Sequence, residues 1–168
     1  MASAVSPASV YNRAAVIFHW ASAVAIIVMW PLGKLMANTG QEPSQFLYSI
    51  HIGLGLVVAA VTLARVIWVF RGPRPEELDM PGWEKILFVA NHYVLYGLLG
   101  LLSLSGIVML LAAGSFDATA IHKGDGPNDQ HELASTVFLV MFVMHVAGVV
   151  YYQAKKGKTL RRMGLPIG

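Results

Sequence analysis

The chain has 168 residues, of which 56% are hydrophobic and only 12% charged, with a formal net charge of +3. About a quarter of the residues in a soluble domain are charged, so this composition excludes an ordinary soluble protein and predicts a membrane protein. The lysines and arginines cluster at helix ends, which argues against a nucleic-acid partner. Because there is no cysteine, disulfides, iron–sulfur clusters, thiolate metal sites and C-x-x-C-H haem attachment are excluded as well.

The first apolar stretch follows a small, polar start and runs from about residue 14 to 33. It is longer than the apolar core of a typical signal peptide and contains His19 near its start, so we expect a retained transmembrane helix. A turn-rich segment, MANTGQEPSQ (36–45), follows it.

Two further spans follow. The second runs from about 46 to 70, with His51 near its start and Arg65 near its end. A proline-rich, charged connection leads to the third span, about 86–113, which carries His92 near its start.

The fourth span, about 131–153, precedes a basic tail that we expect to be solvated. Asp129 as N-cap and Glu132 three residues later form a capping box, which favours a helix. His131 and His145 are fourteen residues apart, which on a helix is about 21 Å along the axis and within about 40° of one face. One helix therefore points an imidazole at its neighbours near each of its ends.

Each span is long enough to cross a bilayer. We therefore predict an all-α fold: an integral membrane four-helix bundle, formed as a single domain over residues 1–168. The outer loops hold two Lys or Arg residues and the other segments hold ten, and this asymmetry predicts that both termini are cytoplasmic. The ten are Arg13, Arg65, Arg71, Arg74, Lys85, Lys155, Lys156, Lys158, Arg161 and Arg162, and the two are Lys34 and Lys123.

This topology sorts the histidines by depth. His19 and His145 lie toward the cytoplasmic ends of their spans, and His51 and His131 lie toward the outer ends. Ionisable side chains inside a bilayer are costly and usually mark function. Two neutral imidazoles that face each other across a bundle are what a six-coordinate b-type haem needs, so we predict two non-covalent haems b, one between the members of each pair. His122 lies in an outer loop, where solvation is the simplest reading.

Several alternatives compete with this prediction. Zinc usually takes three or four protein ligands at one level, and no such cluster is visible in the sequence. A proton path would need carboxylates within the spans, whereas all nine acidic residues fall in loops or at helix ends. Histidines that pack independently, in a bundle without haem such as a transporter subunit, remain an open alternative.

Small and hydroxyl residues near the histidines suit a bound macrocycle. Gly53 and Gly55 follow His51, and Ala147-Gly148 follow His145; such residues let a flat group or a neighbouring backbone come close, although helix packing alone would also explain them. The hydroxyls of Ser22 and Ser49 are candidate partners for the second ring nitrogen of a ligating histidine.

Four motifs in order carry a family resemblance: FHW (18–20), SIHIGLG (49–55), NHYVLYGLLGLLSLSGIVM (91–109), and His131-Glu132 with His145. Over about residues 11–163 the chain resembles the bacterial cytochrome b561 family of four-helix, di-haem membrane proteins. The resemblance implies a multi-pass protein of the bacterial inner membrane. It also implies that His19 and His145 ligate the cytoplasmic-side haem iron, and His51 and His131 the outer one.

The resemblance further implies a quinone-linked oxidoreductase that takes electrons from superoxide outside and passes them through both haems to ubiquinone. A net acidic outer face does not favour capture of an anion, so the donor stays open. A relay or docking cytochrome that serves a separate dehydrogenase, hydrogenase or soluble cytochrome is the alternative. The outer loops contain Lys34 and Lys123 against Glu42, Asp117, Asp125, Asp129 and Glu132.

Near the cytoplasmic interface we expect quinone contacts from His92, Arg65, Tyr93 and Lys85. A quinone needs a hydrogen-bond donor and then protons, and His92 can supply both. The competing interpretation makes Tyr93 an interfacial belt residue, with Arg65 snorkelling or pairing with a haem propionate. The expected partners are therefore quinone, a small one-electron donor or redox protein outside, and the lipid bilayer; a homodimer is compatible with this arrangement.

Overall fold

The structure, a computed structural model, describes residues 10–38, 44–73, 80–114, 128–157 and 159–165. Four of its helices are long and apolar enough to cross a membrane, which confirms the predicted all-α fold with four membrane-length helices. His122 lies outside the described residues. The helices are α1 (Arg13–Asn38), α2 (Gln45–Arg71), α3 (Gly82–Ala112), α4 (Asn128–Lys156) and the short α5 (Thr159–Arg162).

The helices extend beyond the apolar stretches that predict them. The helix α1 continues through Pro31 to Asn38, because membrane helices tolerate the loss of the one backbone hydrogen bond that a proline removes. The helix α4 begins at Asn128, so Asp129 lies within its first turn and not at the predicted N-cap position. A negative charge in the first turn is still favourable to the helix dipole. A count of apolar residues does not find these terminal helical turns, because the turns contain polar residues.

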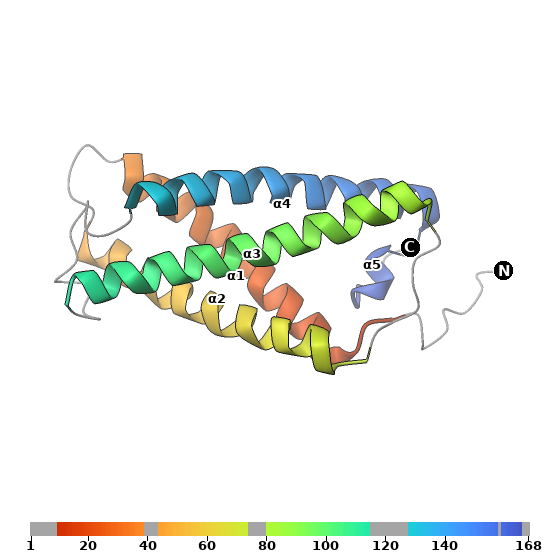
Figure 1. The fold of residues 1–168 in the computed structure, drawn as a ribbon, viewed down its shortest axis with the longest axis horizontal. Helices are drawn as coiled ribbons and strands as arrows, with labels where there is room; N and C mark the ends of the chain where they lie inside the picture. The colour runs from red at the N-terminus through yellow and green to blue at the C-terminus, as the bar shows by residue number, and fades with distance from the viewer. Residues whose placement is uncertain (1–9, 39–43, 74–79, 115–127, 158, 166–168) are drawn as a thin grey trace.

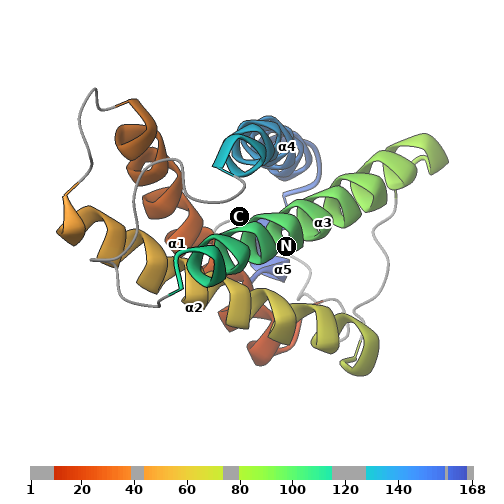
Figure 2. The same ribbon diagram turned by 60° about the vertical axis from the view of Figure 1, so that its left-hand side comes forward.

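The four long helices lie side by side along the long axis of the molecule (Figure 1). The helix α1 packs along α2, and α3 packs along both α2 and α4, so α3 lies between α2 and α4 (Figure 2). At one end of the bundle α1 begins and α4 ends, and we call this the terminal end. At the opposite end, the far end, α1 ends and α4 begins.

The centre of the bundle is small and apolar. One buried side chain from each long helix meets there: Ala25, Val58, Leu99 and Phe138. Many other large apolar side chains are exposed, as expected where helices that are apolar all round face lipid. This central layer separates the two ends of the bundle.

The segment after α4 is held against the start of α1 at the terminal end. The indole Nε1 of Trp20 donates to the carbonyl of Met163 at 2.8 Å, and the backbone N–H of Tyr11 donates to the carbonyl of Arg162 at 3.1 Å. The Arg162 side chain is buried and lies 5.9 Å from the Tyr11 ring centroid. The prediction of a solvated tail over residues 155–164 is therefore wrong for residues 159–163.

Candidate functional site

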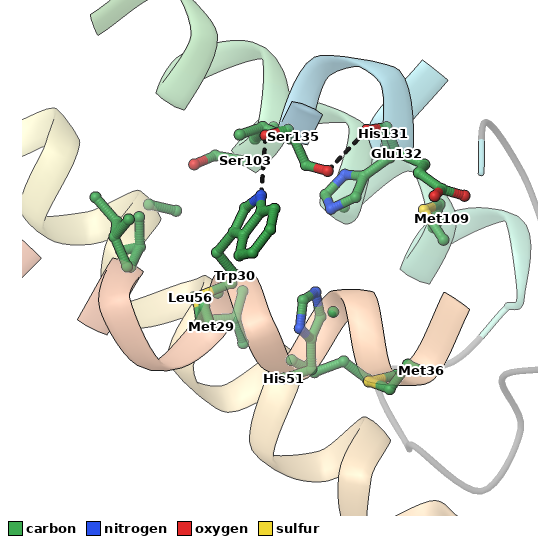
Figure 3. Close-up of a pocket in the computed structure, with 18 of the residues that line it drawn as sticks. Met29, Trp30, Met36, His51, Leu56, Ser103, Met109, His131, Glu132 and Ser135 are labelled. Carbon is green, nitrogen blue, oxygen red and sulfur yellow. Dashed lines mark hydrogen bonds between the residues drawn. The ribbon is translucent and has the colours of Figure 1, made fainter. Parts of the chain in front are cut away.

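The imidazoles of His51 on α2 and His131 on α4 point toward each other at the far end (Figure 3). Their ring centroids are 6.2 Å apart, and both rings line a largely apolar cavity of about 240 Å³. The Ser105 hydroxyl donates to the Leu102 carbonyl at 3.1 Å and lies 2.8 Å from Nδ1 of His131. Because a hydroxyl has one proton, Nδ1–H of His131 donates to Ser105. That tautomer leaves Nε2 available to a metal.

Packing, not hydrogen bonding, positions the second ring at the far end. Nδ1 of His51 is buried and has no hydrogen-bond partner within the described residues. The ring lies close to the backbone of α1, since a Cβ built at Gly33 would be 3.2 Å from Cε1 of His51. A larger residue at position 33 would therefore push this ring.

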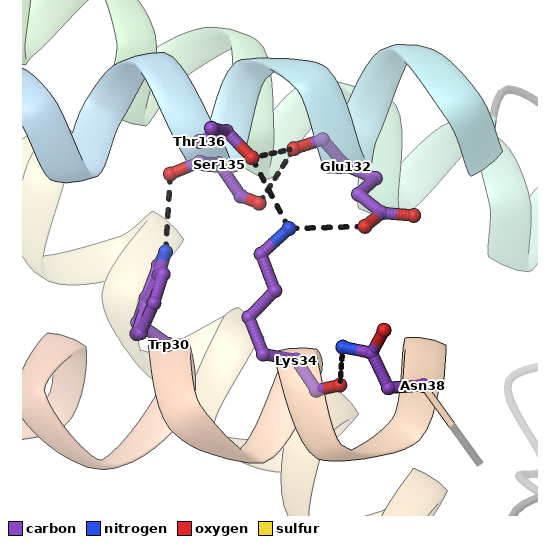
Figure 4. Close-up of polar contacts among 6 residues, drawn as sticks. All are labelled: Trp30, Lys34, Asn38, Glu132, Ser135 and Thr136. Atoms are coloured by element: carbon purple, nitrogen blue, oxygen red, sulfur yellow. Dashed lines mark hydrogen bonds and ion pairs between the residues drawn. The ribbon is translucent and has the colours of Figure 1, made fainter.

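Polar contacts beside the far-end cavity join α1 to α4 (Figure 4). Nζ of Lys34 donates to Oε1 of Glu132 at 2.9 Å and to Oγ1 of Thr136 at 3.1 Å. The indole Nε1 of Trp30 donates to the Ser135 carbonyl at 3.2 Å. These bonds fix the helix that carries His131 relative to α1, and they use the carboxylate that the sequence pattern assigns to a capping box.

At the terminal end, His19 on α1 faces His145 on α4, also with a centroid separation of 6.2 Å. The cavity here is only about 50 Å³. A third imidazole lines it: the ring of His92 on α3 is 4.9 Å from that of His145. Nδ1 of His92 lies 2.7 Å from the Phe88 carbonyl. Since a carbonyl only accepts, Nδ1 carries the proton of a neutral His92.

Arg65 is the one arginine in the lining of the terminal-end cavity. Its Nη1 donates to Oγ of Ser22 at 2.8 Å, its Nη2 lies 3.2 Å from Nδ1 of His19, and its guanidinium carbon lies 5.1 Å from the Tyr96 ring centroid. No described carboxylate forms an ion pair with it. A permanent cation therefore lies among neutral groups beside a histidine.

The other predicted residues are placed differently. The side chains of Tyr93 and Lys85 are exposed and line neither cavity, so they do not gather with His92 and Arg65. The two serines expected beside histidine rings also differ from prediction. The Ser22 hydroxyl bonds to backbone carbonyls of α1, and that of Ser49 bonds to the Gln45 carbonyl on its own helix.

Sequence reasoning missed three residues at these sites. Tyr96 follows His92 by four positions and so shares its helix face, which was a usable signal. Ser105 and Gly33 act across helix pairs, and only the relative rotation of the helices reveals their contacts.

Within the described residues, no three His, Cys, Asp or Glu side chains gather closely enough to hold a metal ion by themselves. The model of the family described as prokaryotic cytochrome b561 matches residues 10–165. The chain belongs to the prokaryotic cytochrome b561 family. The prediction of this family is confirmed, and the protein is a membrane electron-transfer cytochrome of a family whose cofactor is b-type haem.

Two curated relatives of this cytochrome match along most of their length. It is 26% identical over 169 residues to "Cytochrome b561 homolog 2" of Escherichia coli (strain K12), covering 91% of this chain and 90% of the relative. It is 27% identical over 167 residues to "Cytochrome b562" of Cereibacter sphaeroides, covering 93% and 96%.

The imidazole pairs of this cytochrome fit a b-type haem by their spacing. A metal–imidazole bond is about 2 Å long and the ring centre lies about 1 Å beyond the nitrogen, so two axial rings on one iron have centres about 6 Å apart. Both pairs, His51 with His131 and His19 with His145, have this separation. The 4.9 Å between the rings of His92 and His145 is shorter than this separation, so these two rings do not have the spacing of a ligand pair.

The two sites of the cytochrome differ in the room that they offer. The far-end cavity is about five times larger than the terminal-end cavity (about 240 against about 50 Å³). At the far end the histidine pair and the larger, mostly apolar cavity fit the group. At the terminal end the histidine pair fits, but Arg65 and His92 line the narrow space, and their side chains must move aside for a macrocycle.

Proposed function

We propose that this cytochrome binds two b haems, one at each end of the bundle, and carries single electrons from a donor outside the membrane to quinone near the cytoplasmic surface. The observation that carries the proposal is the repetition of one geometry. Two histidine pairs, each with ring centroids 6.2 Å apart, lie at opposite ends of a bundle of membrane-length helices.

A haem b held by two histidines would supply one-electron chemistry and would leave no iron position open for oxygen. The protein residues would supply the rest. His51 and His131 would hold the far-end haem, and His19 and His145 the terminal-end haem. Ser105, 2.8 Å from Nδ1 of His131, would hold that ring in the tautomer that ligation needs, and the apolar layer between the cavities would keep water out of the space between the sites.

The orientation in this proposal rests on the charge asymmetry of the sequence. In the sequence, ten Lys and Arg lie near the predicted cytoplasmic ends of the spans and two near the outer ends, so the terminal end would face the cytoplasm and the far end the outside. The protein would then lie in a bacterial inner membrane with both chain ends on the cytoplasmic side. Electrons would enter through the far-end site and leave from the terminal-end site.

For the acceptor, we assign the quinone contact to His92. Its Nδ1 is committed to the Phe88 carbonyl, so Nε2 is the nitrogen that can meet a quinone oxygen or relay a proton. Arg65 would serve the propionate or the quinone from the same cavity. We do not assign a direct quinone contact to Tyr93 or Lys85, because they do not line that cavity.

For the donor, the family resemblance favours superoxide, but one observation favours a relay that receives electrons from a redox protein. Of the two lysines that the sequence places on the outer side, Lys34 lies within α1 and is already bound to Glu132, and Lys123 lies outside the described residues. A neutralised cation steers an anion weakly. Mixing superoxide with the purified cytochrome and quinone separates the two readings: a rate no faster than spontaneous dismutation favours the relay.

The experiment that tests the core of the proposal is a haem count. The protein is purified in detergent, haem is determined per chain, and reduced-minus-oxidised visible spectra are recorded. We expect two b haems per chain. A haem-saturated preparation that binds one haem, or shows no b-type spectrum, overturns the proposal.

A further inference from the structure

Three side chains line both cavities: Ile26 on α1, Leu99 on α3 and Phe138 on α4. Of these, Phe138 is the largest and the most buried, with 4% of its surface exposed. It belongs to the central layer to which each long helix contributes one residue. Phe138 is therefore the aromatic side chain that touches the far-end site and the terminal-end site at once.

The helical register places Phe138 midway between the two histidines of α4. It is seven residues from His131 and seven from His145, which is about 10 Å along the axis in each direction and within about 20° of the same line. The ring of Phe142 stacks on that of Phe138, with centroids 6.1 Å apart and planes 21° apart. Phe142 lines the terminal-end cavity only, so the pair of rings extends toward His145.

Electron tunnelling weakens steeply across empty space and less steeply through bonded and closely packed atoms. Protein interiors are dense, and a side chain that contacts both sites offers a path with few gaps. Ile26 also touches both cavities, but it is only half-buried. Leu99 is almost as buried as Phe138, but it is smaller and has no aromatic ring to stack on a neighbour.

We propose that Phe138 is the side chain through which an electron crosses between the far-end and terminal-end sites. This inference rests on the proposed function, since it requires a haem at each site. The step oxidises one site and reduces the other by one electron; no bond forms or breaks, and no proton moves.

The test measures the rate of electron transfer between the sites in the holoprotein. Protein in proteoliposomes is photoreduced by a ruthenium complex confined to the far-end side, and reduction of the terminal-end haem is followed optically. The variants are Phe138→Ala, which leaves a gap, and Phe138→Leu, which keeps most of the volume. The matched control is Phe142→Ala, which removes the stacked ring that lines one cavity.

We expect a several-fold loss of rate in Phe138→Ala, a smaller loss in Phe138→Leu, and a rate in Phe142→Ala closer to wild type than that of Phe138→Ala. Only molecules that hold both haems show reduction of the terminal-end haem by transfer from the far-end haem. Partial loss of haem therefore lowers the amplitude of this reduction phase and not its rate. Redox titration checks that both potentials are unchanged. Wild-type rates in both Phe138 variants, with two haems bound, overturn the inference, whereas wild-type protein without two haems overturns the proposed function instead.

Discussion

Nη2 of Arg65 lies 3.2 Å from Nδ1 of His19, so in this structure His19 accepts a hydrogen bond at the nitrogen from which a haem ligand normally donates. A guanidinium has only donors. A neutral imidazole that binds iron through Nε2 carries its proton on Nδ1. A haem at the terminal-end site therefore requires Arg65 to leave Nδ1, while its permanent charge stays in the same part of the bundle.

That charge predicts a difference between the potentials of the two haems. A nearby cation favours the reduced state, because reduction adds a negative charge. We expect Arg65→Gln to lower the potential of the terminal-end haem by about 60 mV, equivalent to a tenfold change for one electron, and Arg65→Lys to keep most of the wild-type value. Redox titration measures both potentials, and an equal shift at the far-end haem would contradict the placement of this charge.

The pairing of histidines predicts separate losses of haem. His145→Ala removes a ligand from the terminal-end site, and His51→Ala removes one from the far-end site. Each variant should retain about half of the wild-type haem per chain, with the remaining haem at the opposite end. His92→Ala is the matched control: it should keep both haems and slow quinone reduction. Equal loss of both haems from either ligand variant would show that the sites are not independent.

The hydrogen bond from His131 to Ser105 predicts a weaker far-end site when it is removed. Loss of such a partner typically costs about 10- to 100-fold in metal affinity. Ser105→Ala should therefore lower affinity for the far-end haem by that order and leave the terminal-end haem in place, as measured by haem titration of the apoprotein. Ser103→Ala changes a serine that lines the same cavity and should bind as wild type does.

The ion pair between Lys34 and Glu132 predicts how the far end responds to an anionic donor. Glu132→Gln frees the cation without changing the size of the side chain. If superoxide is the donor, its capture should become a few-fold faster in this variant, and the gain should vanish at high ionic strength. Lys34→Met should show the opposite change in rate. The free energy of unfolding should change by less than about 1 kcal/mol, because the pair is partly exposed.

The docking of residues 159–165 on α1 predicts resistance to trypsin. Arg162 is buried, and Trp20 holds the carbonyl of Met163. Trp20→Phe removes that hydrogen bond and should speed cleavage after Arg162 several-fold, measured by mass spectrometry. Lys156 is exposed and gives an internal reference. Cleavage at both positions should require inside-out vesicles if the terminal end is cytoplasmic.

The features that follow from helical periodicity and depth could be predicted from the sequence. Four apolar stretches indicate four long helices, and the spacing of His131 and His145 on one helix predicts that a partner meets each of them. His19 and His51 then fall at matching depths, and the structure brings each to the expected neighbour.

Contacts that depend on how the helices are rotated against each other could not be predicted. Ser105 and not Ser49 meets a histidine ring, because α3 turns that face toward α4. Glu132 bonds to Lys34 across two helices, where the local pattern suggested a capping box. Charge alone suggested a solvated tail, whereas Arg162 is buried by contacts with residues far away in the chain.

Helix α4 contributes one histidine to the pair at each end of the bundle. This arrangement limits which insertions and deletions α4 can tolerate. Inserting or deleting one residue between positions 131 and 145 would swing one imidazole by about 100°, out of the bundle and into lipid. The loops have no such restriction on their length. Indels in this lineage should therefore be tolerated between the helices, while the fourteen-residue interval stays tied to the pitch of a single helix.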